Sequence, residues 1–255
     1  MNNILEVKDL CKTYVVNKRQ NNVLRNVSFS VAEGEMVAIM GPSGSGKSTL
    51  LYTVSGMDRV TSGEVRFTGQ DLSALPSDRL AELRLDHMGF IFQQMYMLRN
   101  LSVLDNIILP AIRSEKDKSS RADKRRRGLD LMNKLGINEL ADNDINEVSG
   151  GQLQRACIAR SMINSPEMIF ADEPTGALNR TSSEEVTDEL CRLNSEGTTV
   201  MLVTHDSHVA AKCDRVLFIV DGNIKEEYNL GKYGGASTLR ERERKLNDWL
   251  MDMGW

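Results

Sequence analysis

The fold of this chain is decided by the residues Gly41-Pro42-Ser43-Gly44-Ser45-Gly46-Lys47-Ser48-Thr49. They match the phosphate-binding pattern G-x-x-x-x-G-K-[ST] at every fixed position. The apolar run 36–40 before them has the length of a strand, and residues 49–54 after them can begin a helix. Because a strand, a glycine loop and a helix are the context that such a site requires, the stretch predicts a nucleoside triphosphate-binding loop rather than an ordinary glycine-rich turn.

The residue types in this loop suit a triphosphate. Glycines let successive backbone N–H groups turn toward phosphate oxygens at the amino end of the following helix. We expect Lys47 to reach the β- and γ-phosphates, and the Ser48 hydroxyl to bind a Mg²⁺ ion. The sequence therefore predicts Mg²⁺ as the metal of the site.

Length and composition limit the class of protein. The chain has 255 residues, of which 40% are hydrophobic, enough to bury the core of one domain and a small subdomain. Its formal net charge of −4 gives no support for nucleic acid as a main partner. We expect neither a membrane span nor a signal peptide. The four cysteines form no C-x-x-C pair, so the sequence predicts neither a zinc site nor a disulfide framework.

Polar side chains follow three further apolar runs that are expected to be strands. Gln93 ends the run 88–92, Asp172 and Glu173 end the run that begins at residue 168, and His205 follows the run 199–203. Ligands of parallel sheets bind at the carboxyl ends of the strands. In phosphate-loop enzymes an aspartate there holds Mg²⁺, and a following glutamate can act as general base. Each residue alone is also compatible with a structural role, and the glycine loop upstream favours the catalytic one.

The remaining segments read as a small β region, a helical insertion and a tail. Short strands are expected at 4–7 and 27–31, separated by a polar loop over 15–22, with Tyr14 at an edge. Between residues 94 and 165 the apolar spacing becomes helical. Within that region Ser149-Gly150-Gly151-Gln152 begins a helix with Ser149 as N-cap, which makes a second potential phosphate site, although Ser-Gly-Gly also occurs in ordinary loops.

Taken together, these motifs resemble those of ATP-binding-cassette (ABC) ATPase subunits over residues from about 3 to 230. The motifs of that family occur in order at Tyr14, Gly41–Thr49, Gln93, Val148–Gln152, Asp172, Glu173 and His205. The resemblance implies an α/β fold with a central, mostly parallel sheet, an N-terminal antiparallel β subdomain and a helical subdomain at about 94–165. Residues 231–255 are expected to form a helical tail after an ATPase domain over 1–230.

The resemblance also implies roles for individual residues. ATP and Mg²⁺ would be the cofactors, with the ring of Tyr14 stacked on the adenine. Glu173 would be the general base, Gln93 would sense Mg²⁺ and the attacking water, and His205 would contact the γ-phosphate beside Lys47. Asp172 and Ser48 would hold the metal. The signature 149–152 would face a nucleotide bound to a second copy of the chain, so that two copies enclose two ATP molecules.

Further sequence motifs indicate which subfamily the chain resembles. Phe90–Gln93, residues 101–107 and the block 172–178 resemble the macrolide- and lipoprotein-exporter group, and are closest to its bacitracin- and lantibiotic-resistance branch. That branch implies a separate membrane permease with a large extracellular domain, and a subunit held at the cytoplasmic face of the membrane through this permease. The chain departs from the family at Val148, usually Leu, and at Asn179, usually Asp.

Two other functions share these motifs. One is a non-transporting ATPase that drives a membrane partner mechanically, as in cell division. The other is a soluble cassette protein that acts on ribosomes or DNA, but such proteins usually carry two cassettes or a long coiled-coil insertion, and this sequence contains neither.

Overall fold

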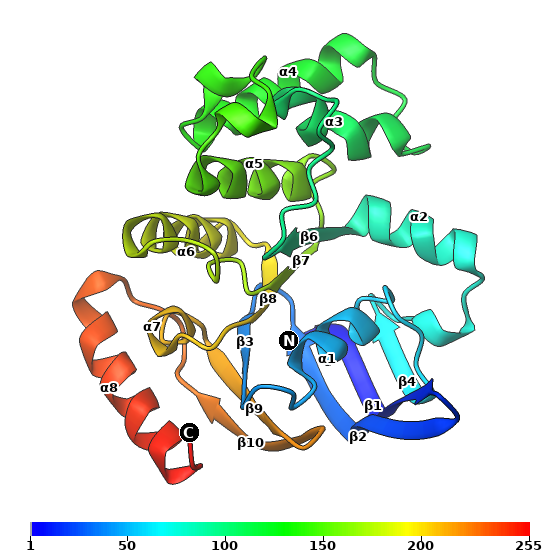
Figure 1. The fold of residues 1–255 in the computed structure, drawn as a ribbon, viewed down its shortest axis with the longest axis vertical. Coiled ribbons are helices and arrows are strands. Elements are labelled where there is room, and N and C mark those ends of the chain that lie inside the picture. Colours follow the sequence, from blue (N-terminus) through cyan, green and yellow to red (C-terminus); the bar gives the residue numbers. More distant parts are fainter. Residues whose placement is uncertain (1) are drawn as a thin grey trace. The chain divides into compact units, whose positions relative to one another are not determined.

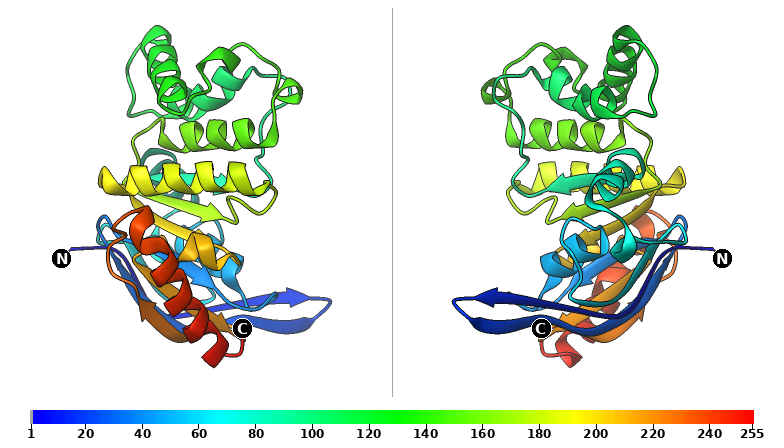
Figure 2. Two further views of the ribbon diagram at one scale, coloured as in Figure 1. Left: turned by 90° about the vertical axis from the view of Figure 1, so that its left-hand side faces the viewer. Right: turned by 90° about the vertical axis from the view of Figure 1, so that its right-hand side faces the viewer.

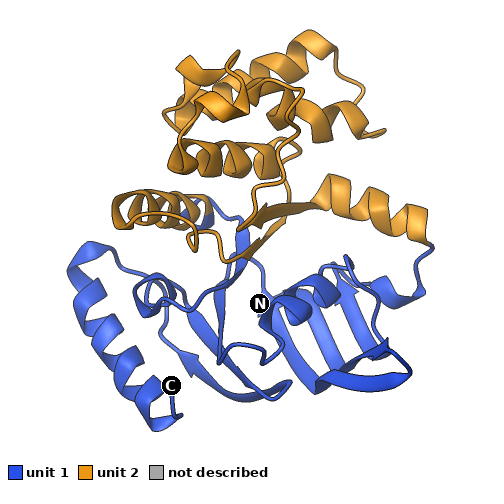
Figure 3. Cartoon of the chain, in the orientation of Figure 1, with its two compact units in different colours: residues 1–76, 194–255 blue, residues 77–193 orange. Residues whose placement is uncertain are grey.

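A computed structural model describes residues 2–255 of the chain. They form two compact units, shown in Figure 3. The first unit comprises the chain up to Pro76 together with Asn194–Trp255, and the second comprises Ser77–Leu193. The residues that the sequence predicts as a site are divided between these two units.

The first unit contains an antiparallel sheet with the strand order β2-β1-β4-β5 (Figure 1). Its strands are β1 (Asn3–Val16), β2 (Arg19–Ala32), β4 (Ser62–Phe67) and β5 (Gln70–Asp71). Leu5, Val7 and Val31 are buried and alternate with more exposed residues, the period of a sheet with one face on the core. The antiparallel β region expected near the amino terminus is therefore present.

The polar segment 15–22, for which the sequence predicts a loop, is instead the tip of a long hairpin. Strands β1 and β2 remain paired as far as Val16 and Arg19. Asn17 and Lys18 form the turn with φ values of 51° and 62°, a conformation that matches the twist of a two-residue hairpin. Val15 and Val16 are 68% and 62% exposed. The strands at this tip are held by backbone pairing and not by burial. The hydrophobic pattern of the sequence therefore does not predict them.

A mostly parallel sheet carries the phosphate loop. Its strands in the first unit are β3 (Met36–Met40), β8 (Thr199–Val203), β9 (Arg215–Val220) and β10 (Asn223–Asn229), in the order β10-β9-β3-β8. Strand β3 is parallel to β8 and β9, whereas β10 returns antiparallel to β9. All five residues of β3 and all five of β8 are buried, as expected for central parallel strands that are covered on both faces.

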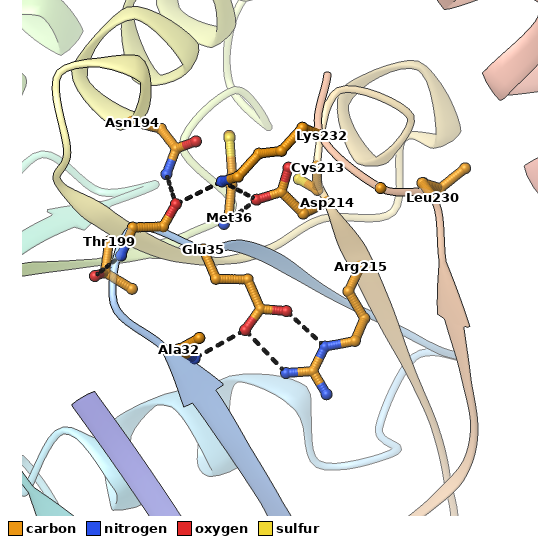
Figure 4. Close-up of polar contacts among 12 residues, drawn as sticks. Ala32, Glu35, Met36, Asn194, Thr199, Cys213, Asp214, Arg215, Leu230 and Lys232 are labelled. Carbon is orange, nitrogen blue, oxygen red and sulfur yellow. Dashed lines mark hydrogen bonds and ion pairs between the residues drawn. The ribbon is translucent and has the colours of Figure 1, made fainter. Parts of the chain in front are cut away.

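A polar network fixes the strands of this sheet at the end opposite the phosphate loop (Figure 4). The Asp214 carboxylate accepts the Met36 backbone N–H at 2.9 Å and the Lys232 ammonium at 2.7 Å. The Arg215 guanidinium donates to Glu35 at 2.8 Å, and Glu35 also accepts the backbone N–H of Ala32. Side chains at the starts of β3 and β9 therefore hold each other's strands in register.

Three helices complete the first unit. They are α1 (Lys47–Val54), α7 (Ser207–Ala210) and α8 (Ala236–Asp252). Helix α8, the carboxyl-terminal tail, runs along the outer strands (Figure 2). Its Trp249 ring lies 5.8 Å from Phe218 of β9 and 5.1 Å from Tyr228 of β10. Leu246 and Leu250 are buried, so the tail packs on its own unit.

Arg242 is the main polar anchor of α8. It is buried and donates to the carbonyl oxygens of Ala211 and Cys213, both at 2.7 Å, which follow α7. It also donates to the carbonyls of Leu230 and Gly231, which precede α8. The Arg242 guanidinium therefore supplies donors to carbonyl groups in two chain segments that lie outside helices and strands.

The second unit combines a parallel strand pair with helices. The strands are β6 (Met88–Phe92) and β7 (Met168–Asp172). The helices are α2 (Ser77–His87), α3 (Val103–Arg113), α4 (Arg121–Lys134), α5 (Gly150–Met162) and α6 (Arg180–Ser195, whose last two residues belong to the first unit). Serine side chains cap α3, α4 and α5. Helices α3 to α5 lie within the region 94–165, where the sequence predicts helical structure.

Among residues 2–255, none of the helices combines the length and the apolar composition that crossing a membrane requires.

We expect Arg242→Met to lower the free energy of unfolding by about 1–3 kcal/mol, because buried carbonyl groups lose their donor. Urea unfolding followed by circular dichroism measures the effect. The matched control is Arg244→Met, an exposed position of the same helix, which should stay within about 0.5 kcal/mol of the parent. Equal urea unfolding midpoints for the two variants would show that Arg242 does not hold α8 in place.

Candidate functional site

The phosphate loop connects β3 to α1 and is built on close backbone contacts. A Cβ atom at Gly41 would lie 2.0 Å from the Ile219 carbonyl oxygen, so no other residue fits there. Gly46 has φ of 102° and is the N-cap of α1, with no side-chain hydrogen bond at the cap. The first N–H groups of α1 are thus left without a side-chain cap at the positive end of the helix dipole, which favours an anion.

Two polar side chains of the loop fit a triphosphate. The Ser45 hydroxyl is buried and has no hydrogen-bond partner among the described residues. The Lys47 ammonium lies over the loop and donates to the carbonyl oxygens of Gly41 and Pro42, both at 2.8 Å. A buried hydroxyl without a partner is uncommon in a folded chain. Here a phosphate oxygen would give it an acceptor, so the loop fits the ligand that its sequence predicts.

His205 leaves the sheet beside the phosphate loop. Ile39 of β3 is paired with Val203 of β8, and the Thr204 N–H donates to the Ile39 carbonyl at 3.2 Å. The residues that follow these positions, Gly41 and His205, therefore emerge from adjacent strands at one edge of the sheet. His205 is exposed, while Asp206 caps the short helix α7 behind it. The first unit thus brings His205 and the glycine loop together.

Tyr14 comes from the antiparallel sheet. The residue is 36% exposed, and its hydroxyl donates to Asp58 at 2.6 Å. Asp58 lies just beyond the end of α1, and its backbone N–H is bonded to the Tyr52 carbonyl of that helix. The tyrosine is therefore connected to the helix that the phosphate loop begins.

In the second unit, the register of β6 and β7 brings Gln93 and Glu173 together. Phe92 is paired with Asp172, so the next residue of each parallel strand leaves the sheet at the same edge. A Cβ atom at Gly176 would lie 2.9 Å from Gln93 Nε2 and 3.0 Å from Glu173 Oε2, which places the ends of both side chains against that glycine. Glu173 has φ of 45°, a strained conformation for a residue other than glycine and one that clusters at functional sites.

The predicted metal ligands suit Mg²⁺ by their chemistry. Asp172 offers a carboxylate, Gln93 an amide oxygen and Ser48 a hydroxyl, all hard oxygen donors. Within residues 2–255, no group of three or more His, Cys, Asp and Glu side chains is arranged to hold a metal. Mg²⁺ at nucleotide sites is usually bound by one or two protein ligands together with phosphates and water, and the donor set fits that mode.

The signature 149–152 forms the exposed start of α5. Ser149 caps the helix, and the Gln152 side-chain oxygen accepts the Ser149 backbone N–H at 3.1 Å. A Cβ atom at Gly151 would lie 2.6 Å from Ser182 Oγ of α6, whereas Gly150 has ordinary space around it. Gly151 is therefore required by packing within the unit, and Ser149 and Gly150 are exposed at the surface.

Asn179, where the family usually has Asp, caps α6. Its side-chain oxygen accepts the Ser182 backbone N–H at 2.9 Å. Asn and Asp both supply this acceptor, and both are favoured N-cap residues. The exchange therefore preserves the helix start and removes a negative charge.

Arg160 is a functional candidate that the sequence reasoning missed. It lies near the end of α5 and donates to the carbonyl oxygens of Met95 at 2.6 Å and Tyr96 at 2.9 Å. These carbonyls belong to the segment that follows Gln93. The backbone of the segment is thus held by α5, while the side chains of Tyr96 and Leu98 are 65% and 47% exposed. An arginine on an amphipathic helix gives no local signal of such a contact.

Comparison with known proteins identifies relatives of this chain. A family model described as ABC transporter matches residues 24–176. The chain is 43% identical over 221 residues to a macrolide export ATP-binding/permease protein MacB of Shewanella sp. (strain ANA-3), covering 87% of this chain and 33% of that protein. The MacB protein of Escherichia coli (strain K12) is also 43% identical, over 224 residues and 34% of its length. The chain thus spans about a third of the length of these curated relatives.

Solved structures match over nearly their whole length. The dimeric structure of MJ0796, a bacterial ABC transporter cassette, has a TM-score of 0.83 and 38% identity, and covers 89% of this chain and 98% of that one. A second dimeric structure shows the same cassette in a post-hydrolysis state, bound to ADP and Pi, with the same TM-score. The likeness confirms the predicted α/β class with an antiparallel β subdomain and a mostly parallel sheet.

We expect Gly176→Ala to slow ATP hydrolysis by about tenfold or more, because the added methyl group displaces the ends of Gln93 and Glu173, and small misplacements of reacting groups cost up to ~100-fold. ATP binding, measured by calorimetry without Mg²⁺, should change little. The control is Gly234→Ala, where a Cβ atom would make only an ordinary contact. Full activity of Gly176→Ala would mean that the two side chains need not lie against this glycine.

Proposed function

This chain belongs to the ABC transporter family, and we propose from that membership that it hydrolyses ATP to drive a membrane permease that exports or removes antimicrobial compounds. The observation that carries the proposal is the contact of Gln93 and Glu173 with Gly176 at the ends of β6 and β7. An amide and a carboxylate at one point, next to Asp172, form a site that can orient and deprotonate a water molecule.

The proposed reaction is transfer of the γ-phosphoryl group to water. The water oxygen bonds to phosphorus as the bond to the ADP oxygen breaks, and Glu173 accepts the proton from the water. Gln93 orients this water through its amide. Lys47 and the N–H groups at the start of α1 hold the phosphate oxygens, and His205 contacts the γ-phosphate from the neighbouring strand. Ser48, Asp172 and Gln93 are the residues that would hold Mg²⁺, which would neutralise charge on the phosphates.

We place the signature of a second copy over the same nucleotide. The exposed Ser149 and Gly150 at the start of α5 support this, because the amino terminus of a helix favours an anion such as a γ-phosphate. The dimeric MJ0796 cassettes, which match this chain over 98% of their length, support the same assembly. Two copies would enclose two ATP molecules and separate when the γ-phosphate is lost.

The permease partner is proposed from one exposed segment. Met95, Tyr96, Met97 and Leu98 form a run of soft apolar side chains whose backbone is held by Arg160. Tyr96 and Leu98 are exposed, and apolar surface of this kind favours a protein partner. We propose that this run binds a cytoplasmic helix of the permease. The permease is expected to carry a large extracellular domain. The subunit would then lie at the cytoplasmic face of the membrane, bound through the permease.

The substrate class is proposed from the sequence motifs and the relatives. The MacB proteins are named for macrolide export. The motifs of this chain are closest to the bacitracin- and lantibiotic-resistance branch of the same group. Antimicrobial peptides are therefore the proposed substrates, recognised by the permease and not by this chain.

Glu173→Gln tests the chemistry. It should retain ATP binding and lose turnover by about 10²-fold or more, because the general base is removed. It should also trap an ATP-bound dimer, seen as an earlier peak in gel filtration. The comparison variant is Lys47→Ala, which should weaken ATP binding itself since it removes a phosphate-contacting cation. Near-normal turnover of Glu173→Gln would exclude Glu173 as the base.

Tyr96→Glu and Leu98→Glu test the permease contact. Placing a charge on the proposed interface should abolish transport or resistance and leave basal ATP hydrolysis within about threefold of the parent, since both side chains are already exposed. Val15→Glu, at an exposed apolar position of the hairpin tip, is the control and should affect neither activity. If hydrolysis and thermal stability fall together with transport, the segment serves the fold and the assignment fails.

A further inference from the structure

Lys12 is a buried cation beside the exposed ring of Tyr14. Its exposed fraction is 7%, and its ammonium lies over the Tyr14 ring, 4.7 Å from the centroid. The pairing of β1 with β2 is irregular between Lys12 and Thr13. Such irregularities change the direction in which nearby side chains point. At this one, the Lys12 ammonium lies against one face of the Tyr14 ring.

Asp58 binds both side chains. One carboxylate oxygen accepts the Lys12 ammonium at 2.6 Å, and the other accepts the Tyr14 hydroxyl at 2.6 Å. The Lys12 ammonium also donates to the Arg59 carbonyl at 2.7 Å. Backbone contacts support the arrangement, because the Thr61 N–H donates to the Cys11 carbonyl. The segment after α1 is therefore bonded to the strand that carries Lys12 and Tyr14.

Ion pairing and hydrogen bonds hold the three side chains of this network in place. A buried ammonium is stable only with a charged or hydrogen-bonded partner, so Lys12 and Asp58 hold each other. Burial would raise the pKa of Asp58, but the bonds from Lys12 and Tyr14 keep that pKa below its ordinary value, so the carboxylate stays ionised. Burial and Asp58 raise the pKa of Tyr14, which keeps its hydroxyl a donor, although a bond with Thr49 opposes that rise.

The Tyr14 hydroxyl connects its strand to the helix that the phosphate loop begins. It donates to Asp58, whose backbone N–H donates to the Tyr52 carbonyl of α1. The Tyr14 ring is therefore held at a set position relative to that helix.

We propose that Lys12 and Asp58 are positioning residues for the nucleotide base, which hold the Tyr14 ring so that its face opposite Lys12 is the surface on which the base stacks. This inference rests on the proposed function and deepens it. A ring that is already fixed loses little conformational freedom when a base stacks on it, which strengthens binding. Because every base has a π-face, the platform favours nucleotides over inorganic polyphosphate and discriminates weakly between adenine and guanine.

Two probes separate the base site from the phosphate site: ATP and inorganic tripolyphosphate, which has no base. Binding of each to the full chain is measured by calorimetry in EDTA, so that no hydrolysis occurs. Lys12→Met and Asp58→Asn should weaken ATP binding by about three- to tenfold, a part of the stacking contribution of one base, and leave tripolyphosphate binding unchanged. Tyr14→Leu should weaken ATP binding by about tenfold or more. GTP should bind within about threefold of ATP.

Controls establish that Lys12 acts through Tyr14. In the Tyr14→Leu background, Lys12→Met should cause no further loss of ATP affinity. Arg66→Met, which removes another ion pair of the same sheet, should leave binding of both probes unchanged. Asp58→Asn preserves side-chain shape, so the test remains available if Lys12→Met folds poorly.

The outcomes distinguish this inference from the proposed function. A parent chain that binds neither probe would overturn the proposed function and the inference with it. A parent that binds both, with Lys12→Met and Asp58→Asn unchanged toward ATP, would overturn the inference alone. An equal loss for ATP and tripolyphosphate, or a further loss in the Tyr14→Leu background, would show that Lys12 supports the fold and does not position the base platform.

Discussion

The close approach of three backbone segments around the phosphate loop is the constraint on which the first unit depends. A Cβ atom at Gly41 would lie 2.0 Å from the Ile219 carbonyl, and one at Gly222 would lie 2.2 Å from the Val23 carbonyl. The Gly222 N–H also donates to the Ser45 carbonyl. The loop, the turn after β9 and strand β2 therefore meet without side chains between them. This contact aims the loop and joins the parallel sheet to the antiparallel one.

Helix α5 plays a comparable part in the second unit. Its amino end is the signature, and Arg160 near its carboxyl end holds the carbonyls of Met95 and Tyr96. A helix of 13 residues is about 20 Å long and stiff. One helix therefore carries the surface proposed to meet a second copy and bonds to the segment proposed to meet a permease.

Charged side chains connect elements at three places where strand or helix ends come together. Asp214 and Glu35 hold the starts of β9 and β3, Arg242 holds the segments around α7 and α8, and Asp58 holds β1 to the segment after α1. Asp214, Glu35 and Asp58 each bond to backbone as well as to side chains, and Arg242 donates to backbone carbonyls of both segments. Buried charges are stable only when satisfied in this way, and once satisfied they specify one arrangement of the chain.

The sequence by itself determined the features that depend on neighbours along the chain. The glycine loop between a strand and a helix, the polar residues at the ends of apolar strands, and the capped start of α5 are local patterns. Only the tertiary structure decided that Gln93 and Glu173 meet at Gly176, and that Lys12 and Asp58, 46 residues apart, enclose Tyr14. It also extended the hairpin past the predicted loop at 15–22. Contacts between distant residues leave no periodic trace in the sequence, because they arise from strand register and packing, which are properties of the folded chain as a whole.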